Sequence, residues 1–160
     1  MATITKKNLR NERSHAGAFG NRWSQIYTFD TNSSGYFLDS DTPAAAVGIT
    51  DVVRLGIIPA GVRLSDALVI ISDASAASVT YKLGFAYVDG VDSTAVPQDD
   101  DYFIVAGTAA STAIRQVANN TAVRPVTLPK DAYLIWTNAG AAHSAAMNVD
   151  VVVQGTMVGV

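Results

Sequence analysis

The sequence predicts an all-β protein, an antiparallel β-sandwich of jelly-roll-like type with an extended N-terminal arm. Two long runs, Val62 to Ile71 and Val79 to Val88, place apolar residues at alternate positions. This period of two, with β-branched and aromatic residues, is typical of half-buried strands because successive side chains leave opposite faces of the pleat. Shorter runs of the same kind recur between turns containing Gly, Pro or Asp. Seven or eight such strands favour two packed sheets.

Length and composition limit the class of protein. The chain has 160 residues, enough for one domain with a core plus an arm. Hydrophobic residues make up 49% and charged residues only 16%, which indicates that much of the surface contacts other protein. The absence of cysteine excludes disulfides and thiolate chemistry. No apolar run has the length of a membrane span or a secretory signal, so we expect no membrane partner and synthesis in the cytoplasm.

The amino terminus differs from the rest of the chain in charge. Five of the 11 basic residues lie within the first 22 positions, against the single acid Glu12: Lys6, Lys7, Arg10, Arg13 and Arg22. The segment also lacks sustained periodicity. We therefore divide the chain into an extended basic N-terminal arm, residues 1–22, and a β-sandwich domain, residues 23–160. The arm is either ordered only against a partner or a frayed end with no role.

The first half of the body is predicted to hold four strands and the turns between them. In chain order these are a strand from Trp23 to Phe29, a turn from Asp30 to Gly35, a short edge strand from Tyr36 to Leu38, a strand from Thr50 to Leu55, a turn at Pro59 to Gly61, and the long strand Val62 to Ile71. Small residues from Ser72 to Ala77 are expected to close a hairpin onto Val79 to Val88.

The second half contains a loop, one helical turn and three strands. Three aspartates, Asp99 to Asp101, end an acidic loop that begins at Asp89 and are placed to cap a short helix from Tyr102 to Ala110. The strand Val123 to Leu128 contains a proline, which predicts an edge or bulge position. Two further strands are expected, Tyr133 to Thr137 and Ser144 to Val153.

Candidate chemistry is sparse. The two histidines, His15 and His143, are too few for a three-histidine zinc site and are expected at the surface, and the common nucleotide-binding and hydrolase motifs are absent. The acidic loop offers hard oxygen ligands of the kind that calcium prefers, but without the alternating spacing of a calcium loop, so a solvated loop is favoured and no metal or cofactor is expected. We therefore predict a protein that is not an enzyme.

Six aromatic residues on predicted strands have two interpretations. They line a sugar-binding face or, more commonly for such alternation, they belong to the core; they are Trp23, Tyr27, Phe29, Tyr81, Phe85 and Tyr87. A carbohydrate-binding β-sandwich of a phage tail or fibre is the alternative function that the first interpretation supports. A hydrolase on a jelly-roll frame is a further rival, and it requires convergent acids in a cleft.

Four stretches of the chain carry a resemblance to a known family. They read VVRLGIIPAGVRLSDALVIISD, YKLGFAYVDGVD, DDDYFIVAG and VTLPKDAYLIWTNAG. Their order resembles the small head-decoration (cement) proteins of tailed bacteriophages, over about Thr50 to Gly159. The resemblance implies β-sandwich or jelly-roll subunits that sit as oligomers on the outside of the capsid. They clamp neighbouring major capsid proteins together.

The resemblance leads to an expected function and set of partners. The protein is expected to be a structural virion protein that binds the outer surface of a phage head, with the major capsid protein and itself, as a dimer or trimer, as partners. The resemblance does not cover residues 1–45, so a capsid-gripping role of the arm is inferred from its charge. The expected capsid-contact residues are Lys6, Lys7, Arg10, Arg13, Arg22 and Trp23. Nucleic acid is not an expected partner because five charges give only weak, salt-sensitive binding.

Overall fold

The computed structural model describes residues 1–7, 21–41, 45–75, 78–109 and 113–158, and these residues form nine strands and no helix. The strands are β1 (Thr3–Thr5), β2 (Arg22–Thr31), β3 (Val52–Ile58), β4 (Val62–Asp73), β5 (Thr80–Tyr87), β6 (Asp99–Thr108), β7 (Ile114–Val117), β8 (Ala132–Ala139) and β9 (Met147–Met157). Within the described part of the chain there is no helix long and apolar enough to cross a membrane.

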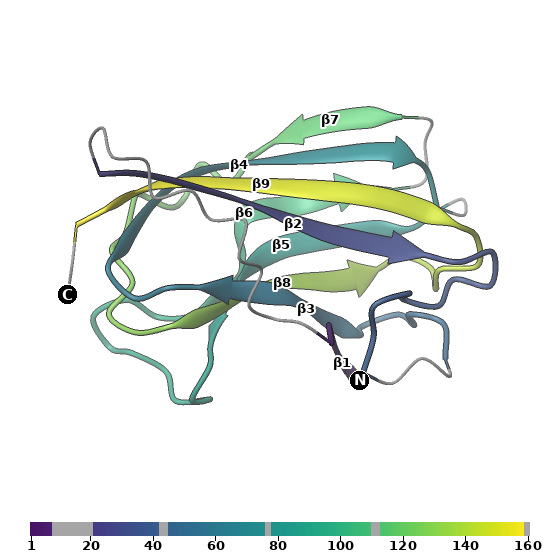
Figure 1. Cartoon of the computed structure of the whole chain (residues 1–160), viewed down its shortest axis with the longest axis horizontal. Helices are drawn as coiled ribbons and strands as arrows, with labels where there is room; N and C mark the ends of the chain where they lie inside the picture. Colours follow the sequence, from purple (N-terminus) through teal and green to yellow (C-terminus); the bar gives the residue numbers. More distant parts are fainter. Residues whose placement is uncertain (8–20, 42–44, 76–77, 110–112, 159–160) are drawn as a thin grey trace.

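The strands form two sheets that pack face to face (Figure 1). One sheet has the order β2-β9-β4-β7 and the other β1-β3-β8-β5-β6. Apart from β1, every pairing is antiparallel. The eight strands β2 to β9 are thus divided four and four, with consecutive strands in opposite sheets over much of the chain. This is the arrangement of a jelly roll, and the predicted fold class is confirmed.

The inner faces of the two sheets form one core. Alternate side chains of β2, including Trp23, Tyr27 and Phe29, are buried there. Phe29 meets Trp136 of the opposite sheet edge to face, with ring centroids 5.3 Å apart, and Trp136 stacks on Tyr81 at 3.7 Å. Such contacts stabilise a core beyond the area that they bury. The aromatic residues therefore join the two layers.

The amino terminus is partly ordered on the protein's own sheet. Strand β1 pairs in parallel with β3, with Ile4 opposite Val53, and the Ile4 side chain is buried. This segment was expected either to be ordered only against a partner or to be a frayed end with no role. It differs because the outer edge of β3 presents unpaired backbone N–H and C=O groups, which an extended segment can satisfy. Residues 8–20 lie outside the described part of the chain.

In strand β4 the buried positions change parity along the sequence, while the buried side chains all stay on the core face. Val62 and Leu64 point into the core, but farther along it is Ala67 and Val69 that are buried. The ladder to β9 shifts register between Leu64 and Asp66, so this bulge adds one residue and restores the inward direction. The single alternation predicted over this run is therefore two alternations joined by a bulge.

Two expected elements are wrong. The segment after β4 does not close a hairpin, because β4 and β5 belong to different sheets and the chain crosses between them. The expected helix from Tyr102 to Ala110 is instead strand β6, whose side chains Tyr102, Phe103 and Ile104 are all buried. Register shifts in the β5–β6 ladder break the alternation there, which is why the pattern suggested a helix.

Two short expected strands form only isolated bridges. Two further strands, β1 and β7, were not predicted. Tyr36 to Leu38 makes single bridges, and Val123 to Leu128 is an irregular segment whose Thr127 bridges to Arg63. Strands β1 and β7 have three and four residues, too few to show a period.

Candidate functional site

The amino-terminal segment lies across the side of the sandwich where β2 is an edge strand and β1 covers the edge of β3. After β1, the Lys6 side chain reaches β2, where its Nζ donates to Thr28 Oγ1 at 2.8 Å and lies 3.8 Å from an Asp39 carboxylate oxygen. Lys6 is only 7% exposed. On the same side, the Tyr27 hydroxyl donates to the Ile57 carbonyl at 3.0 Å. Lys6 therefore stabilises the junction of the two sheets, and its ammonium is not displayed to a partner.

The other expected capsid-contact residues are placed differently from one another. Lys7 is exposed directly after the ordered segment, and Arg22 is exposed at the start of β2. Arg10 and Arg13 lie outside the described residues. Trp23 is 3% exposed and belongs to the core, so its side chain is not available for a contact with a partner. The alternation along β2 was the signal for this, since Trp23 shares its parity with Tyr27 and Phe29.

The sugar-binding interpretation of the aromatic residues is wrong. All six are buried in the core, each with 3% exposure or less: Trp23, Tyr27, Phe29, Tyr81, Phe85 and Tyr87. A face that stacks on a sugar ring needs exposed aromatic rings. These residues instead stabilise the fold.

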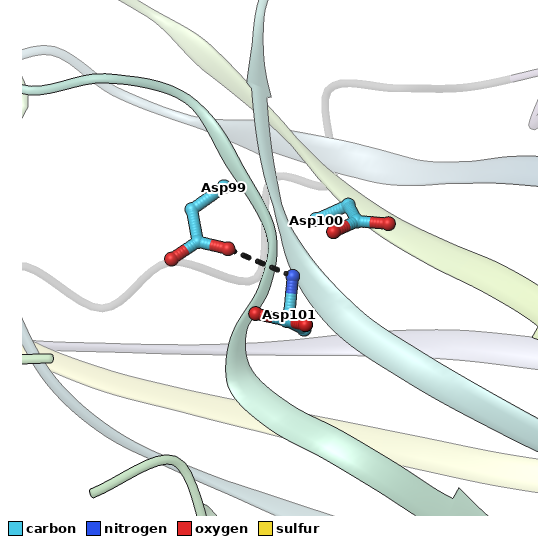
Figure 2. Close-up of side chains that lie close together, drawn as sticks. All are labelled: Asp99, Asp100 and Asp101. Carbon is cyan, nitrogen blue, oxygen red and sulfur yellow. Dashed lines mark hydrogen bonds between the residues drawn. The ribbon is translucent and has the colours of Figure 1, made fainter. Parts of the chain in front are cut away.

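The aspartates of the acidic loop form a compact cluster on β6 (Figure 2). Carboxylate oxygens of Asp99, Asp100 and Asp101 all lie within 4.8 Å of one another, and the Asp101 amide donates to Asp99 Oδ1 at 3.1 Å. Lys82 of β5 lies 3.3 Å from both Asp100 and Asp101. The ammonium group of Lys82 thus neutralises part of the negative charge of the cluster. The expected role as a helix cap is wrong, because β6 is a strand.

A close approach of backbone strands positions the cluster. A Cβ atom at Gly84 of β5 would lie 2.0 Å from the Asp99 carbonyl oxygen, so only glycine fits there. Partial burial is the main cause that raises the pKa of Asp99, and the neighbouring Asp101 and Asp100 raise it further. Among the described residues, no other group of His, Cys, Asp or Glu side chains is arranged to hold a metal ion.

A cavity of about 310 Å³ opens beside the cluster, between the segments 95–99 and 123–126. Its walls are mostly apolar and include Phe85, Val96 and Tyr102, with Arg124 at the polar side. Asp99 is the one acidic residue in the described lining. The hydrolase alternative requires two carboxylates that converge in a cleft, and this cavity offers one.

A buried network surrounds His143, which the sequence analysis expected at the surface. Its Nδ1 lies 2.9 Å from Ser75 Oγ and its Nε2 lies 3.1 Å from Asn138 Oδ1. Asn138 donates through Nδ2 to the carbonyls of Gly48 and Ala141, so its Oδ1 is an acceptor. His143 therefore carries its proton on Nε2 and accepts from Ser75 on Nδ1. Burial lowers the pKa of His143 to about 4.

The Ser–His–Asn set resembles a nucleophilic triad in composition but not in accessibility. Ser75 is 8% exposed, and His143 and Asn138 are 1% exposed. The edge of Phe29 packs against the imidazole, with centroids 5.6 Å apart. Every hydrogen-bonding group of the imidazole has a partner inside the fold. The network joins the segments around Ser75, Gly48 and Asn138, which is a structural role.

Comparison with known proteins relates this fold to phage capsids. No protein-family model matches the chain, and no curated protein matches it in sequence. Its structure is similar to that of a chain from the capsid of Ralstonia phage GP4, with a TM-score of 0.69 and 13% identity, covering 98% of both chains. It is also similar to a chain of the cyanophage Pam1 capsid asymmetric unit, with a TM-score of 0.52 and 14% identity, covering 92% of this chain and 96% of the other.

At these identities the similarity concerns the fold. The likeness to the GP4 chain extends over nearly the whole length of both proteins. The shared structure is therefore not confined to a single hairpin or sheet. This chain has the fold of a protein found in a phage capsid.

Proposed function

We propose that the protein is a structural component of a bacteriophage virion, a decoration (cement) protein that binds the outer surface of the head and clamps neighbouring major capsid proteins. It acts by binding, without turnover and without a cofactor. Its partners are the major capsid protein and further copies of itself. The observation that carries the proposal is the likeness to a capsid chain over 98% of both lengths.

The charge distribution supports a gripping role for the N-terminal arm. Beyond residue 22 the chain has six basic residues and thirteen acids, so the body is acidic and the arm is basic. Complementary charge guides association and fixes the orientation of a partner. Since Lys6 and Trp23 are part of the fold, the proposal assigns capsid contact to Lys7, Arg10 and Arg13. Arg22 lies at the base of the arm, on the exposed face of a sheet.

Strand β1 supports a second element of the proposed contact, the main-chain hydrogen bonds. It adds to the open edge of β3 as an extended segment, and such strand addition supplies affinity through the backbone. On a head, many copies bind a regular lattice. A ligand that binds only the assembled shell stabilises that shell by mass action, and a symmetric array multiplies a modest single contact.

The test replaces the charge of the arm without removing β1. The triple variant Lys7→Ala, Arg10→Ala, Arg13→Ala leaves Ile4 and Lys6 in place, whereas deleting residues 1–22 would also remove the strand that covers β3. We expect the triple variant to need at least about tenfold more protein for half-occupancy of phage heads that lack this protein, because each exposed ion pair contributes modestly. Occupancy is measured by co-sedimentation.

The control is Arg124→Ala, which removes one exposed charge from the body of the sandwich. It should bind heads as the wild type does. All variants should unfold at the wild-type temperature, since none of these side chains is buried in the described part of the fold. A triple variant that reaches half-occupancy at the wild-type concentration would show that the arm does not hold the capsid.

A further inference from the structure

The outward face of the sheet β2-β9-β4-β7 carries an apolar row that crosses all four strands. Ile26 pairs with Val152, Val152 with Leu68, and Leu68 with Val117. Residues directly opposite in adjacent strands point to the same face, and this is the face turned away from the core. Ile26 is 43% exposed and Val117 is 63% exposed, while Leu68 and Val152 are half-buried.

Charged rows of opposite sign lie on the two sides of this apolar row. On one side, Arg22 and Arg63 flank Thr156 in a single row across three strands. On the other side, Asp30 and Asp73 flank Asn148 in the same way. In β2 each charged residue is four positions from Ile26, and in β4 each is five positions from Leu68 with one bulge between. These two outer rows are thus symmetric in spacing about the apolar row and opposite in charge; between them, Asp66 lies on the basic side and Asp150 of β9 on the acidic side.

We propose that this face binds a second copy of the chain, in an isologous dimer whose two-fold axis lies along the apolar row. Rotation by half a turn about that row places an identical face opposite the first, with the strand direction reversed. The apolar row then meets its own copy. Each basic row lies against the partner's acidic row, as a self-complementary interface requires.

The rotation defines three charge pairs between the copies. Residues on the same strand at equal distances from the axis face each other, so Arg22 lies against Asp30 of the partner subunit and Arg63 lies against the partner's Asp73. Asp66 and Arg115 stand one row from the axis, on opposite sides and on the neighbouring strands β4 and β7. The rotation brings them into adjacent positions across the interface. The four charged residues of β4 and β7 are all exposed: Arg63, Asp66, Asp73 and Arg115.

The size of the face predicts a dimer that dissociates on dilution. Four strands spaced about 4.8 Å apart, over about eight residues of 3.3 Å each, give about 500 Å² per partner and about 1,000 Å² in total. That lies at the lower limit for stable protein interfaces. Dimerisation through this face does not require a capsid, so it can be measured on the purified protein alone.

A charge reversal tests the proposed symmetry. Arg63→Asp and Asp73→Arg should each weaken dimerisation by about tenfold or more, because each places like charges together in both symmetry-related pairs. The double variant Arg63→Asp, Asp73→Arg should return to within about threefold of the wild type. The pair on β4 is chosen because Asp30 also lies in the field of Lys6. Arg54→Asp, a charge reversal on β3 of the other sheet, should have no effect.

Sedimentation equilibrium measures these affinities. Three results would overturn the proposal: a wild-type protein that remains monomeric up to about 1 mM, an oligomer that is indifferent to both single reversals, or a double variant that is no better than either single variant. The last result would exclude the two-fold pairing even if the face were in contact.

A cross-link tests the axis independently. The chain has no cysteine, so a single introduced thiol is unique. Val117 lies on the axis and meets its own copy, and Val117→Cys should form a covalent dimer with a short bis-maleimide at micromolar protein concentration. Val91, 62% exposed against 63% for Val117, provides a matched control in the loop after β5. Equal yields from Val91→Cys and Val117→Cys would contradict the assigned axis.

Discussion

His143 lies at the centre of a polar network in an otherwise apolar core. It was expected at the surface because histidine in a turn between small residues is usually solvated, and the sequence carries no sign of Ser75, 68 positions away. The fold brings these residues together through the crossover after β4. Gly35 closes the same region, since a Cβ atom there would lie 2.0 Å from the His143 carbonyl oxygen. A buried histidine with both nitrogens bonded remains neutral.

We predict that His143 makes stability depend on pH between about 6.5 and 4. The unfolded imidazole takes up a proton near its ordinary pKa of 6.5, whereas burial holds the folded pKa near 4. Stability is complete above pH 6.5 and falls as the pH drops through this window, since the unfolded state binds more protons. The full loss is on the order of 3 kcal/mol. Urea denaturation at pH 7, 5.5 and 4 measures it.

The comparison for this prediction is His143→Gln, which lacks a titrating group. The variant is less stable at pH 7, but its free energy of unfolding should change less over the same pH range. Contributions from the carboxylates, including Asp30 with its pKa raised by burial, are present in both proteins and cancel in the difference. Parallel pH profiles for the two proteins would show that His143 is not the source.

At the scale of elements, the sequence predicted most long strands and failed where the ladder is irregular. Strands β2 and β9 show their period of two directly, because one face is buried and the other is not, and β4 shows it on either side of its bulge. In β5 and β8 the alternation continues on both sides of three consecutive buried residues. Strand β6 was missed as a strand because its register shifts leave three consecutive buried residues followed by two exposed ones. The crossover between β4 and β5 depends on which distant strands pair. Local patterns do not contain that information.

The candidate site could also be predicted from the sequence only in part. The basic character of the arm is a property of composition and is visible in the sequence. That Lys6 belongs to the fold follows from a partner 22 positions away, Thr28, whereas the burial of Trp23 could be predicted from its parity in β2. The charge symmetry of the outer face was invisible to the sequence, because it arises from the register of three strands. Only the pairing reveals that Arg63 and Asp73 are equidistant from one row.

The bulge in β4 gives a prediction at the scale of the element. Inserting one serine after Ser65 adds a second extra residue between Leu64 and Asp66, and a shift of one residue turns a whole run of side chains to the other face. Either Ala67, Val69 and Ile71 or the preceding apolar pair would then leave the core. We expect the insertion variant to be unfolded at 25 °C by circular dichroism and urea titration, whereas deleting Ser65 leaves one regular alternation and should be tolerated.

Ser65→Ala is the matched substitution, because it keeps the residue count and removes only the exposed hydrogen bond from Ser65 Oγ to the Gln154 carbonyl, 3.0 Å long. It should cost about 1 kcal/mol or less. An insertion variant with the same urea midpoint as Ser65→Ala would mean that the bulge does not set the face of β4.

At the scale of the whole molecule, the two proposals assign different surfaces to different partners. Lys7 follows β1 at the side where β1 covers β3 (Figure 1), and the apolar row lies on the outward face of the other sheet. A dimer through that face therefore leaves β1 and Lys7 of both copies outside the interface. Two arms on one rigid body can engage two neighbouring capsid subunits, and this is what a clamp requires.

This arrangement predicts that dimerisation strengthens head binding without adding a capsid contact. Val117→Asp places two carboxylates together on the proposed axis, at a side chain 63% exposed in the single chain, so it should separate the copies while leaving the fold and the arm intact. A second arm binds at the effective concentration set by the first. We therefore expect the monomeric variant to need at least about tenfold more protein for half-occupancy of heads that lack this protein. Val91→Asp, at a loop position of equal exposure, should bind as the wild type does. If the monomeric variant instead reached half-occupancy at the wild-type concentration, each copy would grip the shell alone, and the bridge between capsid subunits would have to lie within a single chain.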